Sequence, residues 1–181
     1  MKVTETALPG VLIVENRVFA DSRGSFFESF NLQAASEAGL PNHWVQDNFS
    51  ISKKGVVRGL HYQTIQPQGK LVSVAWGKVV DVAVDLRRSS PHFGQHVAVE
   101  LEGGSGKQLW IPAGFGHGFV VLSDEARFTY KVTDYYCAAG ERTILWNDPD
   151  LAIGWPIDPA EAVLSDKDKQ GKAFREAEVF A

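Results

Sequence analysis

The chain has 181 residues, 44% hydrophobic and 22% charged, which suits a single globular domain over residues 1–181. A net charge of −4 excludes a polycationic surface for DNA or RNA, and no apolar run is long enough to cross a membrane. The single cysteine, Cys137, excludes an internal disulfide, and the first residues carry no apolar secretory segment. We therefore expect a cytoplasmic protein without nucleic-acid or membrane partners.

A short helix is expected over residues 32–38, near the start of the chain. Asn31 is a suitable N-cap, Gly39 is a suitable C-terminal cap, and Pro41 prevents the helix from continuing. This helix is one of the few helical patterns in the sequence.

The middle of the chain is dominated by strand patterns. Apolar and polar residues alternate over residues 79–86 and 96–101, and Phe128, Tyr130 and Val132 share one face of a further strand. Clusters of turn-forming residues separate these segments. This rhythm predicts a mostly antiparallel β-sandwich or barrel rather than a protein of alternating strands and helices.

Close to the C-terminus, Ser165 and Asp168 have the spacing of a capping box. The spacing predicts a second short helix that begins after Ser165. Helices are therefore expected only at the two ends of the fold.

Two glycine-rich stretches resemble the two cupin motifs. Residues 55–77 begin with GVVRGLHYQ, and residues 106–117 read GKQLWIPAGFGH. The glycine, proline and histidine spacings fit both motifs, and glycines permit the sharp turns between barrel strands. The resemblance implies an all-β cupin fold, a jelly-roll barrel of antiparallel strands with a few short peripheral helices.

The metal-binding positions of these motifs are altered. Metal-binding cupins hold the ion with three histidines and a glutamate. Here Gln63 stands at the second histidine, Lys70 lies near the place of the carboxylate, and Val121 replaces the asparagine of the second motif. An ammonium group repels a divalent cation and an amide is a weak ligand, so we expect no metal.

The same residues suggest a site for organic chemistry. Strand alternation places His61 and Gln63 on one face, which looks into the mouth of a small barrel. Arg58 and Lys70 can supply positive charge near His61, for an anion or a developing oxyanion. Such a site could bind phosphate and abstract a proton.

Long segments of the chain resemble the dTDP-4-dehydrorhamnose 3,5-epimerase family. The resemblance covers nearly the whole chain and is carried by VFADSRGSFFESFN (18–31), VQDNFS (45–50), RGLHYQ (58–63), QGKLV (68–72), VDVAVDLR (80–87), QLWIPAGFGHGFVVLS (108–123), FTYK (128–131), WND (146–148) and LSDKD (164–168). It implies an isomerase acting on a dTDP-linked 4-keto-6-deoxy sugar, dTDP-4-dehydro-6-deoxy-glucose, in rhamnose synthesis. The 4-keto group acidifies the hydrogens at C3 and C5, and reprotonation of the enolate from the opposite face inverts each carbon without a cofactor.

Catalytic roles follow from the resemblance. His61 matches the general base, and Asp168 matches the carboxylate that orients its ring. Tyr130 matches the acid that protonates the opposite face. Lys70 matches the group near the carbonyl oxygen, where it would stabilise enolate charge.

The resemblance also implies the residues that bind substrate. They are polar or charged, and they are Arg23, Glu28, Gln46, Asn48, Arg58, His117, Glu141 and Lys167. Arginines suit the diphosphate through bidentate hydrogen bonds. The family's site borrows residues from the N-terminal strands of a neighbouring subunit, so a homodimer is implied.

Departures from the family pattern leave other reactions open. Ser73 stands where the family often has an arginine, and NFS (48–50) and GFGHGF (114–119) replace the commoner NHS and GFAHGF. A relative that inverts only C3, a sugar ketoisomerase and a non-catalytic sugar-binding cupin are alternatives. A metal-dependent cupin oxygenase is a further alternative, which Gln63 and Lys70 disfavour.

Some of these residues also have a purely structural interpretation. Asp168 can satisfy backbone donors of a helix that Ser165 caps, and Tyr130 can be a core tyrosine beside Phe128. Asp81, on the strand over residues 79–86, fits either a polar pocket wall or a second histidine partner. The sequence leaves these readings open.

Overall fold

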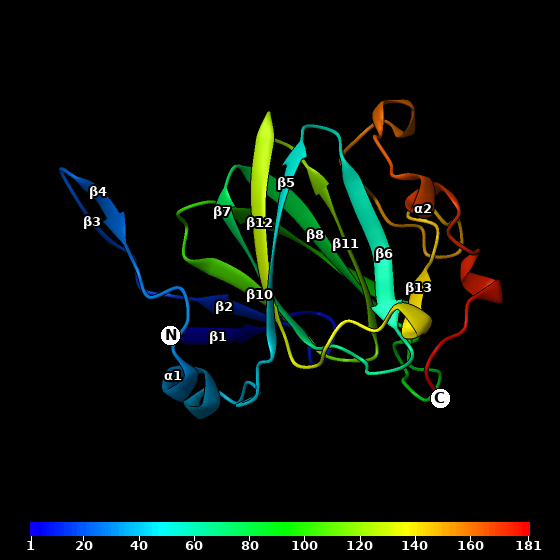
Figure 1. Ribbon diagram of the computed structural model, residues 1–181, viewed down its shortest axis with the longest axis horizontal. Helices are drawn as coiled ribbons and strands as arrows, with labels where there is room; N and C mark the ends of the chain where they lie inside the picture. The colour runs from blue at the N-terminus through cyan, green and yellow to red at the C-terminus, as the bar shows by residue number, and fades with distance from the viewer.

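The structure, a computed structural model, describes residues 1–181 and consists of strands joined by turns and a few short helices (Figure 1). The strands are β1 (Lys2–Glu5), β2 (Leu12–Glu15), β3 (Phe19–Asp21), β4 (Gly24–Phe26), β5 (Gln46–Lys53), β6 (Val57–Gln63), β7 (Lys70–Trp76), β8 (Lys78–Asp85), β9 (His96–Glu102), β10 (Lys107–Ile111), β11 (Phe115–Val121), β12 (Glu125–Val132) and β13 (Glu141–Thr143). The α-helices are α1 (Leu32–Glu37) and α2 (Asp166–Lys169), and the 3-10 helices are η1 (Ala138–Gly140), η2 (Pro159–Glu161) and η3 (Phe174–Glu176).

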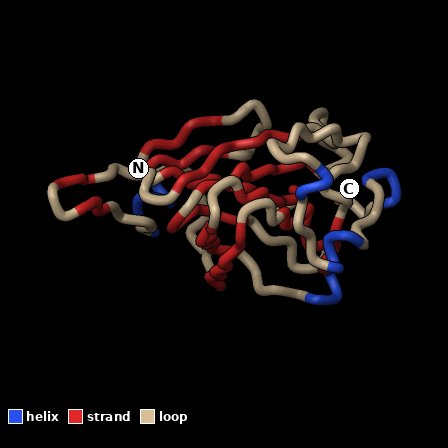
Figure 2. The backbone as a smooth tube through the Cα atoms, turned by 90° about the horizontal axis from the view of Figure 1, so that it is seen from above, coloured by secondary structure: helices blue, strands red, loops and turns tan.

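Two antiparallel sheets form the body of the molecule. The six-stranded sheet has the order β1-β2-β10-β7-β12-β5, and the five-stranded sheet has the order β13-β6-β11-β8-β9. A separate hairpin, β3–β4, pairs only with itself and projects from the side of the body in both views (Figures 1 and 2). The all-β prediction is confirmed, although hydrogen bonding does not run around a closed barrel, because neither edge strand of one sheet pairs with the other sheet.

The predicted strands are present, with ends shifted by a residue or a few. The segment 79–86 is β8, 96–101 is β9, and 128–132 is the second half of β12. Both faces of β8 are buried: Asp81 and Ala83 face the space between the sheets, while Val82 and Val84 pack beneath the C-terminal segment. The chain after β13 therefore covers the outer face of the five-stranded sheet.

The main core lies between the two sheets. It is a cluster of 15 buried residues, contributed mainly by inward-facing positions of β7 to β12, and Phe128 is its largest fully buried side chain. The rings of Phe119 and Phe128 stack at 4.2 Å, which joins β11 of one sheet to β12 of the other. This packing holds the two sheets together at the core. Beside it, polar residues line the space between the sheets.

Both predicted helix starts are confirmed. The Asn31 side chain accepts a hydrogen bond from Ala34 N at the start of α1, and Gly39 follows this helix with a φ of +81°. The hydroxyl of Ser165 accepts a hydrogen bond from Asp168 N at the start of α2. No helix in the structure is long and apolar enough to cross a membrane.

Candidate active site

A cavity of about 340 Å³ opens between the two sheets beside the core. Its volume is within the range of small-molecule sites, and most of its polar residues come from strands. The residues that line it are Asn48, Phe49, Ser50, Arg58, His61, Tyr62, Gln63, Gln68, Lys70, His117, Phe119, Phe128, Tyr130, Tyr136 and Glu141. Both sheets contribute, so the cavity has two facing walls.

One wall is formed where β6 and β11 approach each other closely. Gly59 has a φ of +129°, and a Cβ atom there would lie 2.5 Å from the Cα of Gly118. Only glycine permits this approach. It places His61 of β6 directly opposite His117 of β11 in the antiparallel register, so both imidazoles stand on the same wall.

His61 is paired with the carboxylate of Asp168. His61 Nε2 lies 2.5 Å from Asp168 Oδ1, although the residues are 107 positions apart in the chain. Burial alone would raise the pKa of Asp168, but hydrogen bonds from His61, Ser165 and the Gly59 amide outweigh it and hold the pKa below its usual value. Asp168 is therefore ionised at neutral pH and accepts the Nε2 proton.

The tautomer and the protonation state of His61 follow from this pairing. Because Nε2 carries the proton that Asp168 accepts, Nδ1 of the neutral ring holds the free lone pair. Burial lowers the pKa of His61, and the hydrogen bond and charge of Asp168 only partly oppose this effect. His61 is thus neutral at pH 7 and can accept a proton.

Lys70 supplies a buried ammonium group to the same cavity. It is 8% exposed, and its Nζ lies 3.4 Å from the backbone oxygen of His61. Burial lowers its pKa to about 8, while the negative charges of Asp81 and Glu141 oppose the shift. The group is charged at neutral pH and lacks a directly bonded carboxylate, so it is free to meet a negative atom of a ligand.

A second histidine–carboxylate pair lies deeper in the same wall. His117 Nε2 is 2.9 and 3.1 Å from the two oxygens of Asp81, which is completely buried on β8. Burial raises the pKa of Asp81, and the nearby His117 and Lys70 oppose the rise. Of the two readings that the sequence left open for Asp81, the structure bears out the histidine partner.

Tyr130 stands on the facing wall, on β12 of the six-stranded sheet. Its ring packs against the core beside Phe128, with ring centroids 6.1 Å apart. Burial raises its pKa above the ordinary value of 10, so the hydroxyl keeps its proton at neutral pH. Tyr130 therefore packs against the core, as the structural interpretation predicts, and it also lines the cavity.

The rim of the cavity is a chain of polar contacts. Glu141 of β13 is ion-paired with Lys167 of α2, and it accepts a hydrogen bond of 3.0 Å from the Tyr136 hydroxyl. On β5, the Gln46 amide donates to Asn48 at 2.8 Å. The Tyr136 amide also donates to Gln46 Oε1 at 3.2 Å, so the loop after β12 is joined to a strand of each sheet.

Ten of the twelve predicted site residues gather at this cavity. Seven line it, Asp168 lies behind His61, Lys167 holds Glu141, and Gln46 holds Asn48. Arg23 and Glu28 lie elsewhere: Arg23 is ion-paired with Asp21 in the β3–β4 turn, and Glu28 accepts from Asn31. Gln68, to which sequence reasoning assigned no contact, also lines the cavity. Tyr136 lines it too, and it is one of two adjacent tyrosines of which the sequence predicts that at most one stacks on the thymine base.

Gln63, which stands at the second histidine of the cupin motif, is engaged in other contacts. The Gln63 side chain bonds to backbone atoms of Gln66, Tyr135 and Cys137, so it holds the loop after β12. No group of three histidine, cysteine, aspartate or glutamate side chains is placed to hold a metal ion. The site offers a neutral imidazole on one sheet, and an ammonium group and a phenol on two neighbouring strands of the facing sheet. This combination is suited to proton transfer beside a carbonyl.

Comparison with known proteins agrees with this chemistry. The family model described as dTDP-4-dehydrorhamnose 3,5-epimerase matches residues 5–176. A protein of that description from Pseudomonas aeruginosa is 57% identical, and the match covers 99% of each chain.

Solved structures show the same fold. A dTDP-6-deoxy-D-glucose-3,5-epimerase from Legionella pneumophila, in complex with dTDP-4-keto-L-rhamnose, is 49% identical with a TM-score of 0.94, covering 98% of this chain and 94% of that one. A 3'-monoepimerase from Streptomyces bikiniensis, in complex with dTDP-quinovose, is 32% identical with a TM-score of 0.87, covering 94% and 86%. Enzymes that differ in the number of inverted carbons therefore share this architecture.

Proposed function

The chain belongs to the dTDP-4-dehydrorhamnose 3,5-epimerase family, whose members are isomerases, and we propose that it inverts C3 and C5 of dTDP-4-dehydro-6-deoxy-glucose by proton transfer alone. The observation that carries this proposal is the arrangement of His61 and Tyr130 on facing walls of one cavity, with Lys70 between the sheets. Each of these groups has a role in making or quenching an enolate.

His61 is the proposed base. Its Nδ1 lone pair takes the proton from C3 or C5, and the electron pair of the broken C–H bond moves into the enolate. The imidazolium that forms is stabilised by the carboxylate of Asp168, which already holds Nε2 at 2.5 Å. The lowered pKa of His61 keeps it unprotonated, and therefore competent, at neutral pH.

Tyr130 is the proposed acid. It stands on the sheet opposite His61, so a proton from its hydroxyl reaches the carbon from the other face. Protonation from that face inverts the centre, whereas return of the proton from His61 restores the starting sugar. The raised pKa of Tyr130 keeps the proton available until a strongly basic enolate is formed.

Lys70 is the proposed partner of the developing oxyanion at C4. A buried ammonium interacts strongly with a negative oxygen, because little water is present to screen the charge. Arg58 lies at the exposed edge of the cavity, where its guanidinium can meet the diphosphate while its Nε donates to Ser52 at 3.0 Å. His117, Glu141 and Asn48 are proposed to contact the sugar and the nucleotide.

A homodimer completes the proposed site. Arg23 and Glu28, which the family resemblance assigns to the substrate, lie on or beside the projecting β3–β4 hairpin and not at the cavity of their own chain. Phe19 and Phe26 of the hairpin are 51% and 70% exposed, which is unfavourable in an isolated chain. We assign the hairpin to the cavity of a second copy of the chain.

The test is the reaction in deuterium oxide with dTDP-4-dehydro-6-deoxy-glucose, followed by NMR. We expect deuterium at both C3 and C5 and inversion at both carbons. Deuterium and inversion at C3 alone would identify a 3-epimerase, like the relative from Streptomyces bikiniensis. Binding without any exchange would identify a non-catalytic binding protein.

The same assay separates the base from the acid. In Tyr130→Phe we expect proton exchange to persist while inversion falls, because His61 still removes and returns a proton on its own face. Tyr62→Phe is the matched control. Although residue 62 is among the lining residues, its ring packs in the core cluster beneath the C-terminal segment, and its hydroxyl donates to the Glu178 backbone oxygen at 2.7 Å. Equal losses of exchange and inversion in Tyr130→Phe would contradict the assigned acid.

A further inference from the structure

The projecting segment has almost no support along its length. We call residues 17–28 the arm; it contains β3 and β4, which pair with each other and with no other strand. Its strand residues are all exposed. The direction in which the arm points must therefore be set at its root, where the chain leaves the body and returns to it.

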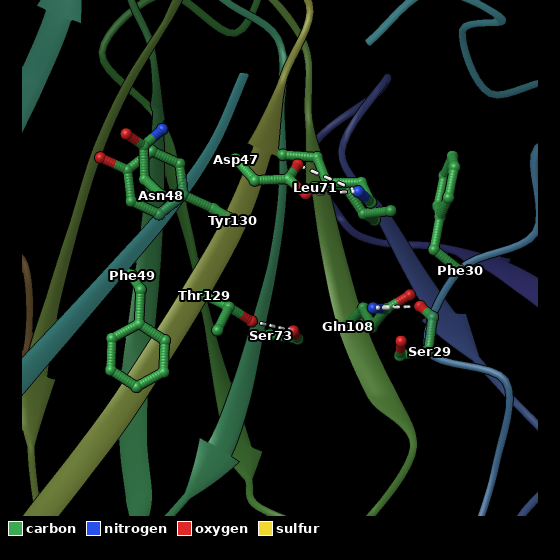
Figure 3. Close-up of a pocket in the computed structure, with 11 residues that line it drawn as sticks. Ser29, Phe30, Asp47, Asn48, Phe49, Leu71, Ser73, Gln108, Thr129 and Tyr130 are labelled. Carbon is green, nitrogen blue, oxygen red and sulfur yellow. Dashed lines mark hydrogen bonds and ion pairs between the residues drawn. The ribbon is translucent and has the colours of Figure 1, made fainter. Parts of the chain in front are cut away.

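One buried side chain bonds to both ends of the root. Gln108, on β10, is 5% exposed; its Oε1 accepts from Asn16 Nδ2 at 3.1 Å, and its Nε2 donates to the Ser29 backbone oxygen at 2.9 Å. Figure 3 shows the bond between Gln108 and Ser29 on the outer face of the six-stranded sheet. Asn16 directly precedes the arm and Ser29 directly follows it.

An amide is suited to this double contact. It presents an acceptor on one side and donors on the other, so the two bonds can form together only when both ends of the arm are in place. Because the group is only 5% exposed, loss of either partner would leave a largely buried polar atom without its hydrogen bond to the protein. The amide therefore ties the two ends of the arm to one point on β10.

Neighbouring contacts hold the backbone at this point from other directions. Asn16 N donates to Gly106 O at 2.9 Å, and a Cβ atom at Gly106 would lie 2.8 Å from Asn16 O. On the returning side, the Lys131 ammonium lies 4.7 Å from the centre of the Phe30 ring and is also bonded to Asp47 at 2.9 Å. The root is therefore held by several contacts, in contrast to the arm beyond it, which pairs only with itself.

We propose that Gln108 is a positioning residue that clamps both ends of the arm and so sets where Arg23 and Glu28 enter the cavity of a second copy. The inference rests on the proposed function, in which the arm serves the partner's site. At about 3.3 Å per extended residue, Arg23 lies up to about 20 Å from the root, so a tilt of about 5° moves it by about 2 Å. Displacements of that size are large for a substrate contact.

The variants are designed to release the arm without touching the cavity. Gln108→Leu removes both hydrogen bonds at similar volume, and Gln108→Glu keeps the acceptor for Asn16 while it places a carboxylate against the Ser29 oxygen. Ser73→Ala is the matched control, because Ser73 is the register partner of Gln108 on β7 and its hydroxyl bonds Thr129 at 2.8 Å, away from the arm. Asn16→Ala breaks one bond and leaves Gln108 in place, in case the Gln108 variants do not fold.

We expect the Gln108 variants to lose about 10- to 100-fold in kcat/KM, mostly through a higher KM, with the pH profile unmoved. Asn16→Ala should show a smaller rise in KM, and Ser73→Ala should behave as the unaltered protein. A wild-type KM in folded Gln108→Leu would overturn the inference.

Mixed dimers separate an effect in the partner's site from damage to the variant's own chain. Gln108→Leu is co-expressed with His61→Ala under different affinity tags, and the heterodimer is isolated. Its one working cavity belongs to the Gln108→Leu chain but receives the intact arm of the His61→Ala chain. We expect this cavity to recover the wild-type KM.

A third chain, with residues 18–27 replaced by two glycines, distinguishes failure of the clamp from failure of the proposed function. If this chain is rescued by His61→Ala but Gln108→Leu is not, Gln108 acts within its own chain and the clamp is wrong, while the arm still serves the partner. If the chain without the arm has a wild-type KM by itself, the arm supplies nothing and the proposed dimeric site is wrong.

Discussion

The two histidine–aspartate pairs of the cavity wall use the same residue types in opposite electrostatic settings. Asp168 accepts three hydrogen bonds, and its pKa is held below the usual value, whereas Asp81 is completely buried and its pKa is raised. His61 retains 29% of its side-chain exposure and His117 only 9%. This difference agrees with the proposal that the first pair exchanges a proton with the substrate, while Asp81 of the second pair raises the pKa of the nearby Lys70.

The pairs also differ in how the fold builds them. Asp81 and His117 lie on adjacent strands, β8 and β11, whose register brings them together. His61 and Asp168 join β6 to α2, a helix of the C-terminal segment. The pair proposed to do the chemistry therefore depends on a long-range contact, while the supporting pair is part of the sheet itself.

Removal of the His61 imidazole, the less buried of the two, is the strongest test of this difference. In His61→Ala we expect turnover to fall by about 10²–10⁴-fold, because the general base is lost, while dTDP still binds. His43→Ala, at an exposed histidine outside the cavity, is the control. The measurement is steady-state turnover together with calorimetric binding of dTDP, and near-normal turnover in His61→Ala would exclude the assigned base.

Removal of the carboxylate behind the base should have a smaller effect and a characteristic pH dependence. His61 must be neutral to act, and its pKa lies below the ordinary 6.5, so activity should fall as the pH drops through that lowered value. Asp168→Asn removes the charge that opposes the shift, so the pKa of His61 falls further and the acid limb moves to lower pH. We expect turnover to fall by about 10- to 100-fold.

Ser165→Ala is the control for Asp168→Asn, since it removes the helix cap and one hydrogen bond to Asp168 but leaves the charge. It should leave the acid limb nearly in place. An acid limb that moves upward in Asp168→Asn would contradict the proposed pairing.

The deep pair should instead control the basic limb. The pKa of Lys70 is about 8, so its charge, and with it the activity, should be lost as the pH rises through that value. Asp81→Asn removes a negative charge that raises this pKa, so the basic limb should move to lower pH. For a shift of up to one unit, the loss of activity should be about twofold at most at pH 7 and should approach about tenfold above pH 8. A pH–rate profile of kcat/KM that keeps its basic limb in Asp81→Asn would show that the two pairs are not divided in this way.

Much of the fold could be predicted because it depends on local patterns. Alternation over residues 79–86 identified β8, the caps Asn31 and Ser165 identified α1 and α2, and alternation in β6 placed His61 and Gln63 on the cavity side. The remaining assignments of the site came from family resemblance rather than from a physical pattern. Asp168 shows this limit, because the same residue fits a helix cap and a histidine partner, and its contacts serve both.

Other features depend on contacts that no local pattern reports. Gln108 is a polar residue at the start of β10, and its two partners become neighbours only after the arm leaves and returns. The lowered pKa of Lys70 arises from burial between sheets, and Tyr136 reaches the cavity from an irregular loop. The strand rhythm left a sandwich and a barrel open, and the structure has two sheets whose edge strands do not pair with each other.

The bond between β6 and α2 has a consequence for how the chain becomes active during synthesis. All strands of the two sheets are complete by Thr143, but the partner of His61 is Asp168, which is added to the chain 107 residues after it. A ribosome that stops between Thr143 and Asp168 releases a chain that has every strand of the two sheets. That chain lacks the carboxylate that pairs with the His61 imidazole. The proposed base therefore lacks its partner until translation has passed α2 and this helix has docked.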